Sequence, residues 1–320
     1  MQEIGLMHYV PKTYLKYFSS EKMKGQFKEY FINFLLNNAV AKSKIRETNT
    51  KRICLEKNIY MLNGETEDER QMLENMYKEV FENGYDNLYK ILTNESKESI
   101  TLTERYSVIS FVVSIFYRNN YWINLHNKFM DQVYESIYFL SKANGNDMFY
   151  MEEQEISIVG KTLGELQSEC KSGTKQRIAL LTAKRIFELT RWRLINDVIT
   201  IVEAGSDCEF ITSDNPVTFS PKIAGEWPIP FDPTNTLSIP IDHKHLLQLR
   251  PWGKELDIRT LFRMHEHGNV GAINAAINNK CQLAQSERFI LGTQTGLQKF
   301  QENTEGILQV KNVAYEIVFI

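Results

Sequence analysis

The chain has 320 residues, 42% of them hydrophobic and 12% aromatic, so it holds enough apolar surface for a full core in one large domain or two packed halves. The formal net charge of −3 excludes a global electrostatic attraction to nucleic acid or to an anionic membrane. Any such affinity must come from local patches. The most apolar window, Val108–Tyr117, is much shorter than the ~18 residues that a membrane helix needs, and it is predicted to be a buried helix.

The four cysteines, Cys54, Cys170, Cys208 and Cys281, lie far apart and form no CxxC pair. This spacing fits neither a zinc module nor a disulfide framework, and it predicts four unpaired thiols in a reducing compartment. The first residues show no basic segment followed by an apolar one, so no secretory signal is expected. We therefore predict a cytoplasmic protein.

The first sixty residues are predicted to contain one short helix and an early strand pair. Apolar residues recur at helical spacing between Val10 and Phe18, and Pro11 suits a first helical turn. Two β-rich stretches follow, Phe27–Leu36 and Arg52–Met61.

The next section is predicted to be helical. An apolar stripe with steps of three and four residues runs from Thr66 to Thr93. Thr101 followed by Glu104 has the spacing of a capping box, and it opens a helical stretch that runs to about Ala143 with a break near Arg118–Asn120. The turn signal at residues 144–147 (NGND) marks the predicted boundary.

The second half is predicted to change from helix to sheet at about Arg191. A helix is expected from Glu155 to Leu189, and another from about Ile258 to Cys281. The predicted strands are Arg191–Val202, Glu209–Ser220, Thr236–Ile241, His245–Leu249, Arg288–Gly292 and Ile307–Ile320. The predicted fold class is therefore α+β, with a helical N-terminal half (residues 1–146) packed on a mixed, mainly antiparallel C-terminal sheet (residues 147–320) in one compact unit.

His8 is the first candidate for a functional residue. It stands immediately before a predicted helix N-terminus, where its ring can face a ligand whose negative charge is held by backbone N–H groups. The alternative is a helix-entry histidine bonded to a backbone carbonyl.

The second candidate is the segment Phe210–Val217 (FITSDNPV). A strand that runs into Ser213, Asp214 and Asn215 ends in an Asx-type turn, with three short polar side chains at one strand end. The alternative is that these side chains only bond the turn backbone before Pro216.

Several markers in the chain occur together: HYVPKTYLKYF from His8 to Phe18, Asn58-Ile59-Tyr60, Arg118 at the end of an apolar helix, Trp192, FITSDNPV, and Glu287-Arg288-Phe289-Ile290. In this order they resemble the bacterial family known as domain of unknown function 4238 (DUF4238), and they span the chain from His8 to about Gly292. Many members carry two adjacent histidines where this chain has Met7-His8, so a paired-histidine metal site is not implied. Members often have Arg, a small residue and Pro where this chain has Arg118-Asn119-Asn120, which leaves open a helix that continues.

Other catalytic motifs are not supported. Ser213-Asp214-Asn215 is shared with serine β-lactamases, but the only KTG-like element, Lys171-Ser172-Gly173, precedes it where it should follow. His243 and His245 would share a face only on a strand, and they lack partner ligands. No phosphate-binding or dinucleotide-binding glycine motif is present. No metal or cofactor is predicted.

Charge is unevenly distributed along the chain. Eleven Lys/Arg against four Glu lie between Lys12 and Lys57, and seven against one between Lys171 and Arg193, while Glu65–Glu98 is acidic. If the two basic segments meet near His8, they would make a phosphate-binding surface with Tyr9, Tyr14 and Tyr17 available for stacking. The alternative is a solvated face balanced by the acidic helix.

Two functional hypotheses follow. The first is a metal-independent phosphodiester hydrolase, RNase-like and acting as a defence or toxin effector, with His8 as general acid or base, Asp214 assisting it, and Arg118 or Arg193 holding the phosphate. The second is a non-catalytic module that binds a small anionic ligand or regulates a partner. The predicted partners are thus nucleic acid or a small anion, and no membrane. The further predicted ligand-binding residues are Tyr9, Tyr14, Arg193, Ser213, Asn215 and Arg288.

Overall fold

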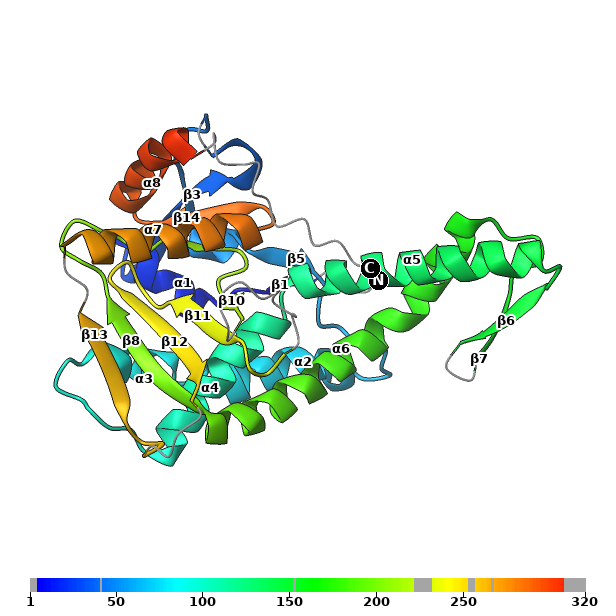
Figure 1. The fold of residues 1–320 in the computed structure, drawn as a ribbon, viewed down its shortest axis with the longest axis horizontal. Coiled ribbons are helices and arrows are strands. Elements are labelled where there is room, and N and C mark those ends of the chain that lie inside the picture. The colour runs from blue at the N-terminus through cyan, green and yellow to red at the C-terminus, as the bar shows by residue number, and fades with distance from the viewer. Residues whose placement is uncertain are drawn as a thin grey trace.

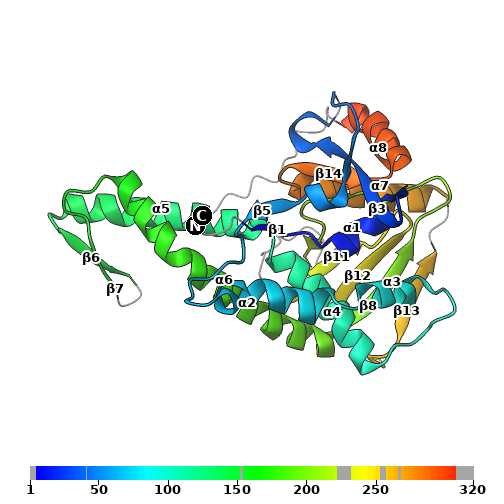
Figure 2. The ribbon, with the colours of Figure 1, turned by 180° about the vertical axis from the view of Figure 1, so that it is seen from behind.

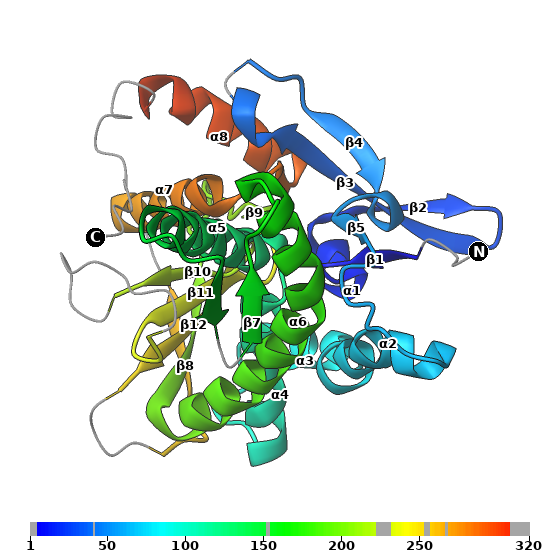
Figure 3. The ribbon, with the colours of Figure 1, turned by 90° about the vertical axis from the view of Figure 1, so that its right-hand side faces the viewer.

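The structure is a computed structural model that describes residues 5–40, 42–151, 154–221, 232–252, 257–265 and 268–307. Two β-sheets lie one above the other, with helix α7 (Gly268–Gln285) between them (Figures 1 and 3). Helix α7 packs against a strand of each sheet, β10 and β9. The other face of the first sheet is covered by helices of the first two hundred residues.

The first sheet has the strand order β10-β11-β12-β8-β13. Its neighbours are antiparallel except β13, which runs parallel to β8. Its strands are β8 (Asp197–Glu203), β10 (Thr218–Ser220), β11 (Thr236–Pro240), β12 (His245–Pro251) and β13 (Leu261–His265). All but one residue of β8 are buried, as expected for the strand between two neighbours in a sheet covered on both faces.

The second sheet joins the two ends of the chain. Its order is β2-β3-β14-β9, and β4 also pairs with β3, antiparallel, through Phe31–Phe34. The ten-residue strand β3 pairs with β2 through its first half and with β14 through its last residues, where Leu36 lies opposite Phe289. Its strands are β2 (Ser20–Lys24), β3 (Phe27–Leu36), β4 (Arg46–Asn49), β9 (Thr212–Ser213) and β14 (Phe289–Gly292). Helix α8 (Gln294–Ile307) packs on β3 and β14.

A short strand pair holds the His8 segment. Strand β1 (Leu6–His8) pairs antiparallel with β5 (Leu55–Lys57), so His8 lies opposite Leu55. Helix α1 (Lys12–Leu15) and the 3-10 turn η1 (Lys16–Phe18) follow. Two further 3-10 turns, η2 (Asn37–Ala39) and η3 (Thr50–Arg52), flank β4.

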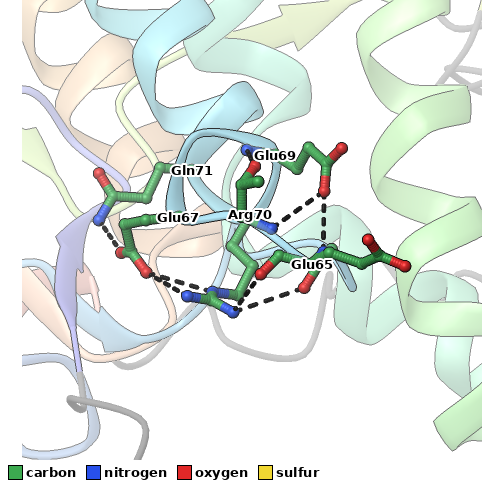
Figure 4. Close-up of polar contacts among 7 residues, drawn as sticks. Glu65, Glu67, Glu69, Arg70 and Gln71 are labelled. Carbon is green, nitrogen blue, oxygen red and sulfur yellow. Dashed lines mark hydrogen bonds and ion pairs between the residues drawn. The ribbon is translucent and has the colours of Figure 1, made fainter.

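The acidic segment forms α2 (Glu67–Met76), a π-helical turn η4 (Tyr77–Glu82) and α3 (Tyr85–Thr93). Helix α2 begins with a capping box, in which Thr66 and Glu69 satisfy each other's backbone N–H groups. Figure 4 shows this helix start, where Glu69 also accepts from the backbone N–H of Glu65 and Arg70 contacts Glu67. The π-helical turn closes with a hydrogen bond from the Asn83 N–H to the Lys78 carbonyl, five residues back.

Two long helices extend away from the body. Helix α5 (Asn120–Ala143) and the 34-residue α6 (Leu163–Asn196) carry the β-hairpin β6 (Met148–Met151) and β7 (Gln154–Ser157) at their far end (Figures 1 and 2). This arm has a small core of its own, with Tyr134, Tyr138, Phe149, Ile158 and Leu166. Helix α4 (Leu102–Tyr117) is instead buried almost throughout and belongs to the main core.

The α+β class is correct, but the predicted division into a helical first half and a C-terminal sheet is wrong. Strands β1–β5 all precede residue 60, and α6, α7 and α8 lie in the second half. Helix α6 continues to Asn196, because Ile186, Thr190 and Arg193 are buried at helical spacing where strand-like alternation was inferred. Residues 261–265, predicted as helix, form β13 beside β8.

Three cysteines, Cys54, Cys208 and Cys281, are free thiols, as predicted. The side chain of Cys170 and the predicted terminal strand over residues 308–320 lie outside the described residues. Within the described ranges, none of the helices combines the length and the apolar character needed to cross a membrane.

Candidate active site

Arg118 lies at the centre of the candidate site. It caps the C-terminal end of α4, with φ −90° and ψ 0°, and its N–H donates to the Ser114 carbonyl at 3.1 Å. Its own carbonyl accepts a hydrogen bond of 2.8 Å from the hydroxyl of Tyr60. The break that the sequence indicated near this residue is therefore present, and it turns the arginine side chain out of the helix and into the protein interior.

The guanidinium of Arg118 is completely buried and only partly satisfied. Its Nη1 lies 2.8 Å from Oε1 of Glu82, and its central carbon lies 5.2 Å from the ring centroid of Tyr77. The contact with Glu82 is an ion pair without good hydrogen-bond alignment, and within the described part of the chain Nε and Nη2 have no hydrogen-bond partner. Buried donors of this kind are costly and uncommon, so they are candidate contacts for a ligand.

The π-helical turn explains how Tyr77 and Glu82 both reach Arg118. In an α-helix, residues five apart point about 140° away from each other. Hydrogen bonding from residue i to i+5 brings them to the same side. Although burial alone lowers the pKa of Arg118, the charge of Glu82 raises it above its ordinary value, so the guanidinium is a permanent cation.

His8 interacts electrostatically with this cation. Its Nε2 lies 3.2 Å from the carbonyl oxygen of Thr50, so Nε2 carries the proton and Nδ1 is left as the basic atom. Burial is the main cause that lowers the pKa of His8 to about 4; the positive charges of Lys12 and Arg118 act in the same direction, and the bond to Thr50 opposes the shift. His8 is therefore neutral at physiological pH.

A second carboxylate, Glu74, completes the cluster. Burial raises the pKa of Glu74, and the charge of Glu82 raises it further, while Arg118 and Lys12 oppose the shift. The cluster thus combines a base in its neutral form, a carboxyl group that holds its proton more tightly than usual, and two cations. These are the components of proton transfer beside a bound anion.

Asp214 has a different environment. Its carboxylate accepts hydrogen bonds from the backbone N–H groups of Glu287, Arg288 and Phe289 at 3.0, 2.8 and 3.2 Å. Burial raises the pKa of Asp214 to about 6 in spite of these bonds. The carboxylate therefore fastens the turn after β9 to the start of β14.

The neighbours of Asp214 are also engaged. Ser213 Oγ donates to Gln282 Oε1 at 2.7 Å, and Asn215 Nδ2 donates to the Gln285 carbonyl at 3.1 Å. Asn215 Oδ1 accepts from the side chain of Asn119. The SDN turn thus joins α7 to the end of α4, which favours the structural alternative for Ser213 and Asn215.

The structure brings the His8 and Asp214 regions close to each other without joining the two residues. Asn119, next to Arg118, bonds Asn215, and the hydroxyl of Tyr9, next to His8, interacts electrostatically with Asp214. Within the described ranges His8 and Asp214 share no hydrogen bond. Their catalytic cooperation stays a prediction.

The other predicted ligand residues lie at four places. Tyr9 is buried, with its N–H bonded to the Cys54 carbonyl at 3.1 Å, and Tyr14 is buried between the two sheets. Arg193 is bonded to Asp197 and to the Asn235 carbonyl at 2.5 and 2.8 Å. Arg288 is exposed, with its guanidinium 4.9 Å from the Phe289 ring centroid. Of these four, only Arg288 has a side chain open to solvent.

Glu74, Tyr77 and Glu82 were not predicted as functional residues from the sequence. Glu74 follows Leu73 and precedes Tyr77 within the buried stripe of the acidic helix, and a carboxylate beside a buried stripe was the available signal. Within the described ranges, including the cluster around Arg118, no three His, Cys, Asp or Glu side chains are arranged to hold a metal ion.

The fold and the cluster together define an α+β protein with a buried arginine, two carboxylates and a neutral histidine at one site. The chain belongs to the family described as protein of unknown function (DUF4238), whose model matches residues 7–295. No curated protein and no solved structure gave a match.

Proposed function

We propose that this protein is a metal-independent phosphodiester hydrolase of RNase type. The observation that carries the proposal is the buried guanidinium of Arg118, which has N–H donors without a partner. It interacts electrostatically with the neutral His8 and with Glu74, whose raised pKa favours the protonated form. A fixed cation with unsatisfied donors stabilises the charge that builds on phosphoryl oxygens in the transition state.

In the proposed reaction, Nδ1 of His8 takes the proton of an RNA 2′-hydroxyl, and the 2′-oxygen forms a bond to the adjacent phosphorus. The bond from phosphorus to the 5′-oxygen breaks, and Glu74 in its protonated form gives its proton to that oxygen. The products are a 2′,3′-cyclic phosphate and a free 5′-hydroxyl. Arg118 and Lys12 hold the phosphoryl oxygens, and Glu82 keeps Arg118 in place.

Asp214 has a supporting place in this scheme, since three backbone N–H groups occupy its carboxylate. It positions the turn beside Asn119 and Arg118. We propose that an enzyme of this kind, acting on cellular RNA, serves as a defence or toxin effector.

The experiment is cleavage of a fluorescent single-stranded RNA by the purified full chain in EDTA, with a DNA of the same sequence as the substrate control. We expect RNA cleavage only, because DNA lacks the 2′-hydroxyl. His8→Gln and Glu74→Gln should each lower the rate about 10²- to 10⁴-fold. Glu79→Gln, an exposed glutamate of the π-helical turn, is the matched control and should leave the rate unchanged. Equal cleavage by His8→Gln and wild-type protein would refute the proposal.

A second candidate function is non-catalytic binding of a small anion. It is favoured by the complete burial of the Arg118 side chain, since a ligand that replaces the missing hydrogen bonds is sufficient to satisfy it. In that case Arg118→Lys would weaken anion binding, as measured by calorimetry, while no RNA is cleaved by any form of the protein.

A further inference from the structure

We infer that the substrate is a single-stranded polyanion, held by exposed cations that flank the His8 segment, and not a mononucleotide or a duplex. The inference rests on the proposed function and names the substrate class of the same site.

The first group of cations lies on the η3 side of His8. The His8 ring contacts the Thr50 carbonyl at 3.2 Å, and the next two residues are the exposed Lys51 and Arg52. Lys12, the first residue of α1, is exposed as well. None of the three has a carboxylate within 4 Å in the part of the chain that the structure describes. Their charges are therefore available to an external anion.

Further cations lie across the β1–β5 pair and at the start of β14. The exposed Lys57 lies opposite Leu6, two residues from His8 along the same strand. The exposed Arg288 interacts electrostatically with Tyr9, the residue after His8. Apart from Glu74 and Glu82 of the site itself and Asp214, which is bonded to three backbone N–H groups, the acidic groups nearby are Glu56, which has a partner of its own, and Glu287, which accepts from Asn124. Five exposed cations from four segments thus surround one short strand.

More cations than one phosphate requires point to a substrate with several phosphates. Arg118 and Lys12 suffice for the phosphate that reacts, so Lys51, Arg52, Lys57 and Arg288 remain for its neighbours along a strand. Contacts between Lys or Arg and phosphates release counterions, which makes such binding strongly dependent on salt.

The burial of the reacting groups selects a single strand. The Arg118 side chain has 0% exposure, and His8 is partly covered. A phosphate in a duplex backbone cannot leave its rigid helix to enter such a site, whereas an unstacked strand can present one nucleotide at a time.

The test measures binding apart from cleavage. The His8→Gln protein is titrated, by fluorescence anisotropy, into labelled RNA of two nucleotides, RNA of twelve nucleotides and a twelve-base-pair RNA duplex, at several KCl concentrations. We expect the single-stranded 12-mer to bind at least tenfold more tightly than the dinucleotide or the duplex. When Lys51→Glu and Arg52→Glu are introduced into the His8→Gln protein, the slope of log K against log salt should become less steep by about 1.4. Each phosphate contact on a single strand contributes about 0.7 to the magnitude of this slope.

The matched control is Lys90→Glu with Lys280→Glu, which changes the same charge at exposed positions on α3 and α7 and should leave the slope unchanged. Three results would each overturn the inference, even if wild-type protein cleaves RNA. They are equal binding of the dinucleotide and the 12-mer, tighter binding of the duplex, and the same salt slope in the Lys51/Arg52 variant as in the Lys90/Lys280 control. If cleavage is absent but the predicted binding pattern holds, the hydrolase proposal falls and the inference stands. Thermal melting of every variant confirms that it is folded.

Discussion

The hydroxyl of Tyr14 lies 2.6 Å from Oγ1 of Thr212 in β9 and donates a hydrogen bond of 2.7 Å to the carbonyl of Pro240 in β11. Since β9 and β11 belong to different sheets, one tyrosine of the HYVPKTYLKYF segment joins both. Its ring also packs against Phe18, Tyr85 and Phe111. The segment from His8 to Phe18, which contains α1, thus has a packing role next to the proposed catalytic one.

Tyr14→Phe should destabilise the protein by about 1 to 3 kcal/mol, because it leaves the buried Pro240 carbonyl without this donor and the buried Thr212 hydroxyl without this acceptor. Urea unfolding checks this. Tyr17→Phe is the control from the same segment, and its hydroxyl bonds the exposed Asp86, so we expect a loss below about 1 kcal/mol. Equal losses in the two variants would contradict the assigned role of Tyr14.

Glu82→Gln should cost about 3 to 5 kcal/mol of unfolding free energy, because it leaves the fully buried Arg118 without a counter-charge. The double variant Glu82→Gln with Arg118→Met should recover a large part of this loss. The measurement is a double-mutant cycle by urea unfolding, with Glu79→Gln as a neutral comparison. A double variant less stable than Glu82→Gln alone would show that the pair is not coupled in this way.

His8 should make stability depend on pH. Its pKa is about 4 in the folded protein and 6.5 when unperturbed, so the unfolded chain binds the proton more tightly between these values. Stability from the neutral ring is therefore present above pH 6.5 and is lost as the pH falls towards 4, by up to about 3 kcal/mol. His8→Gln should remove this contribution from the stability profile measured between pH 4.5 and 7, while the opposite contribution of Asp214, whose pKa is raised to about 6, should remain. A profile identical to that of the wild type would contradict the low pKa of His8.

The same groups set the expected pH dependence of RNA cleavage. The rate should fall below about pH 4, where His8 takes up a proton, and it should fall on the alkaline side, where Glu74 loses its own. Because the pKa of Glu74 is raised, the optimum should lie on the acidic side of neutrality. In the Glu74→Gln variant, the pH profile of the residual activity should no longer fall on the alkaline side. If the alkaline fall persists, a group other than Glu74 causes it.

Asp214→Ala should destabilise the protein by at least about 3 kcal/mol, since three backbone N–H groups lose their common acceptor. The activity of the remaining folded protein should be close to that of the wild type. Urea unfolding and activity per folded molecule separate the two effects. Abolished activity with unchanged stability would support the direct catalytic role that the sequence suggested.

Local signals in the sequence predicted the elements that depend on local interactions. The capping box of Thr101 and Glu104 marks the start of α4, and the ten residues of β3 were predicted without error in their bounds. The end of α6 was not predictable in this way, since alternation and helical periodicity overlap in residues 191–196, and tertiary packing of Thr190 and Arg193 decides between them.

The candidate site follows the same division. His8 and Arg118 stand at element ends that the sequence makes visible. Glu74 and Glu82 were hidden, because their contact with Arg118 depends on a π-helical turn that no simple residue pattern announces. The anchoring of Asp214 by residues 287–289 was equally hidden, since it joins segments more than seventy residues apart.

The pairing of β3 with β14 sets the order in which the protein can mature during synthesis. Strand β3 leaves the ribosome early, but the partner of its last residues, Phe289–Gly292, emerges about 250 residues later. At translation rates of about 5 to 20 residues per second, that edge of β3 waits unpaired for roughly 10 to 50 seconds. An exposed strand edge is a template for pairing with other chains, so a chaperone that covers this edge would protect the nascent protein, and the proposed hydrolase activity would appear only when translation is nearly finished.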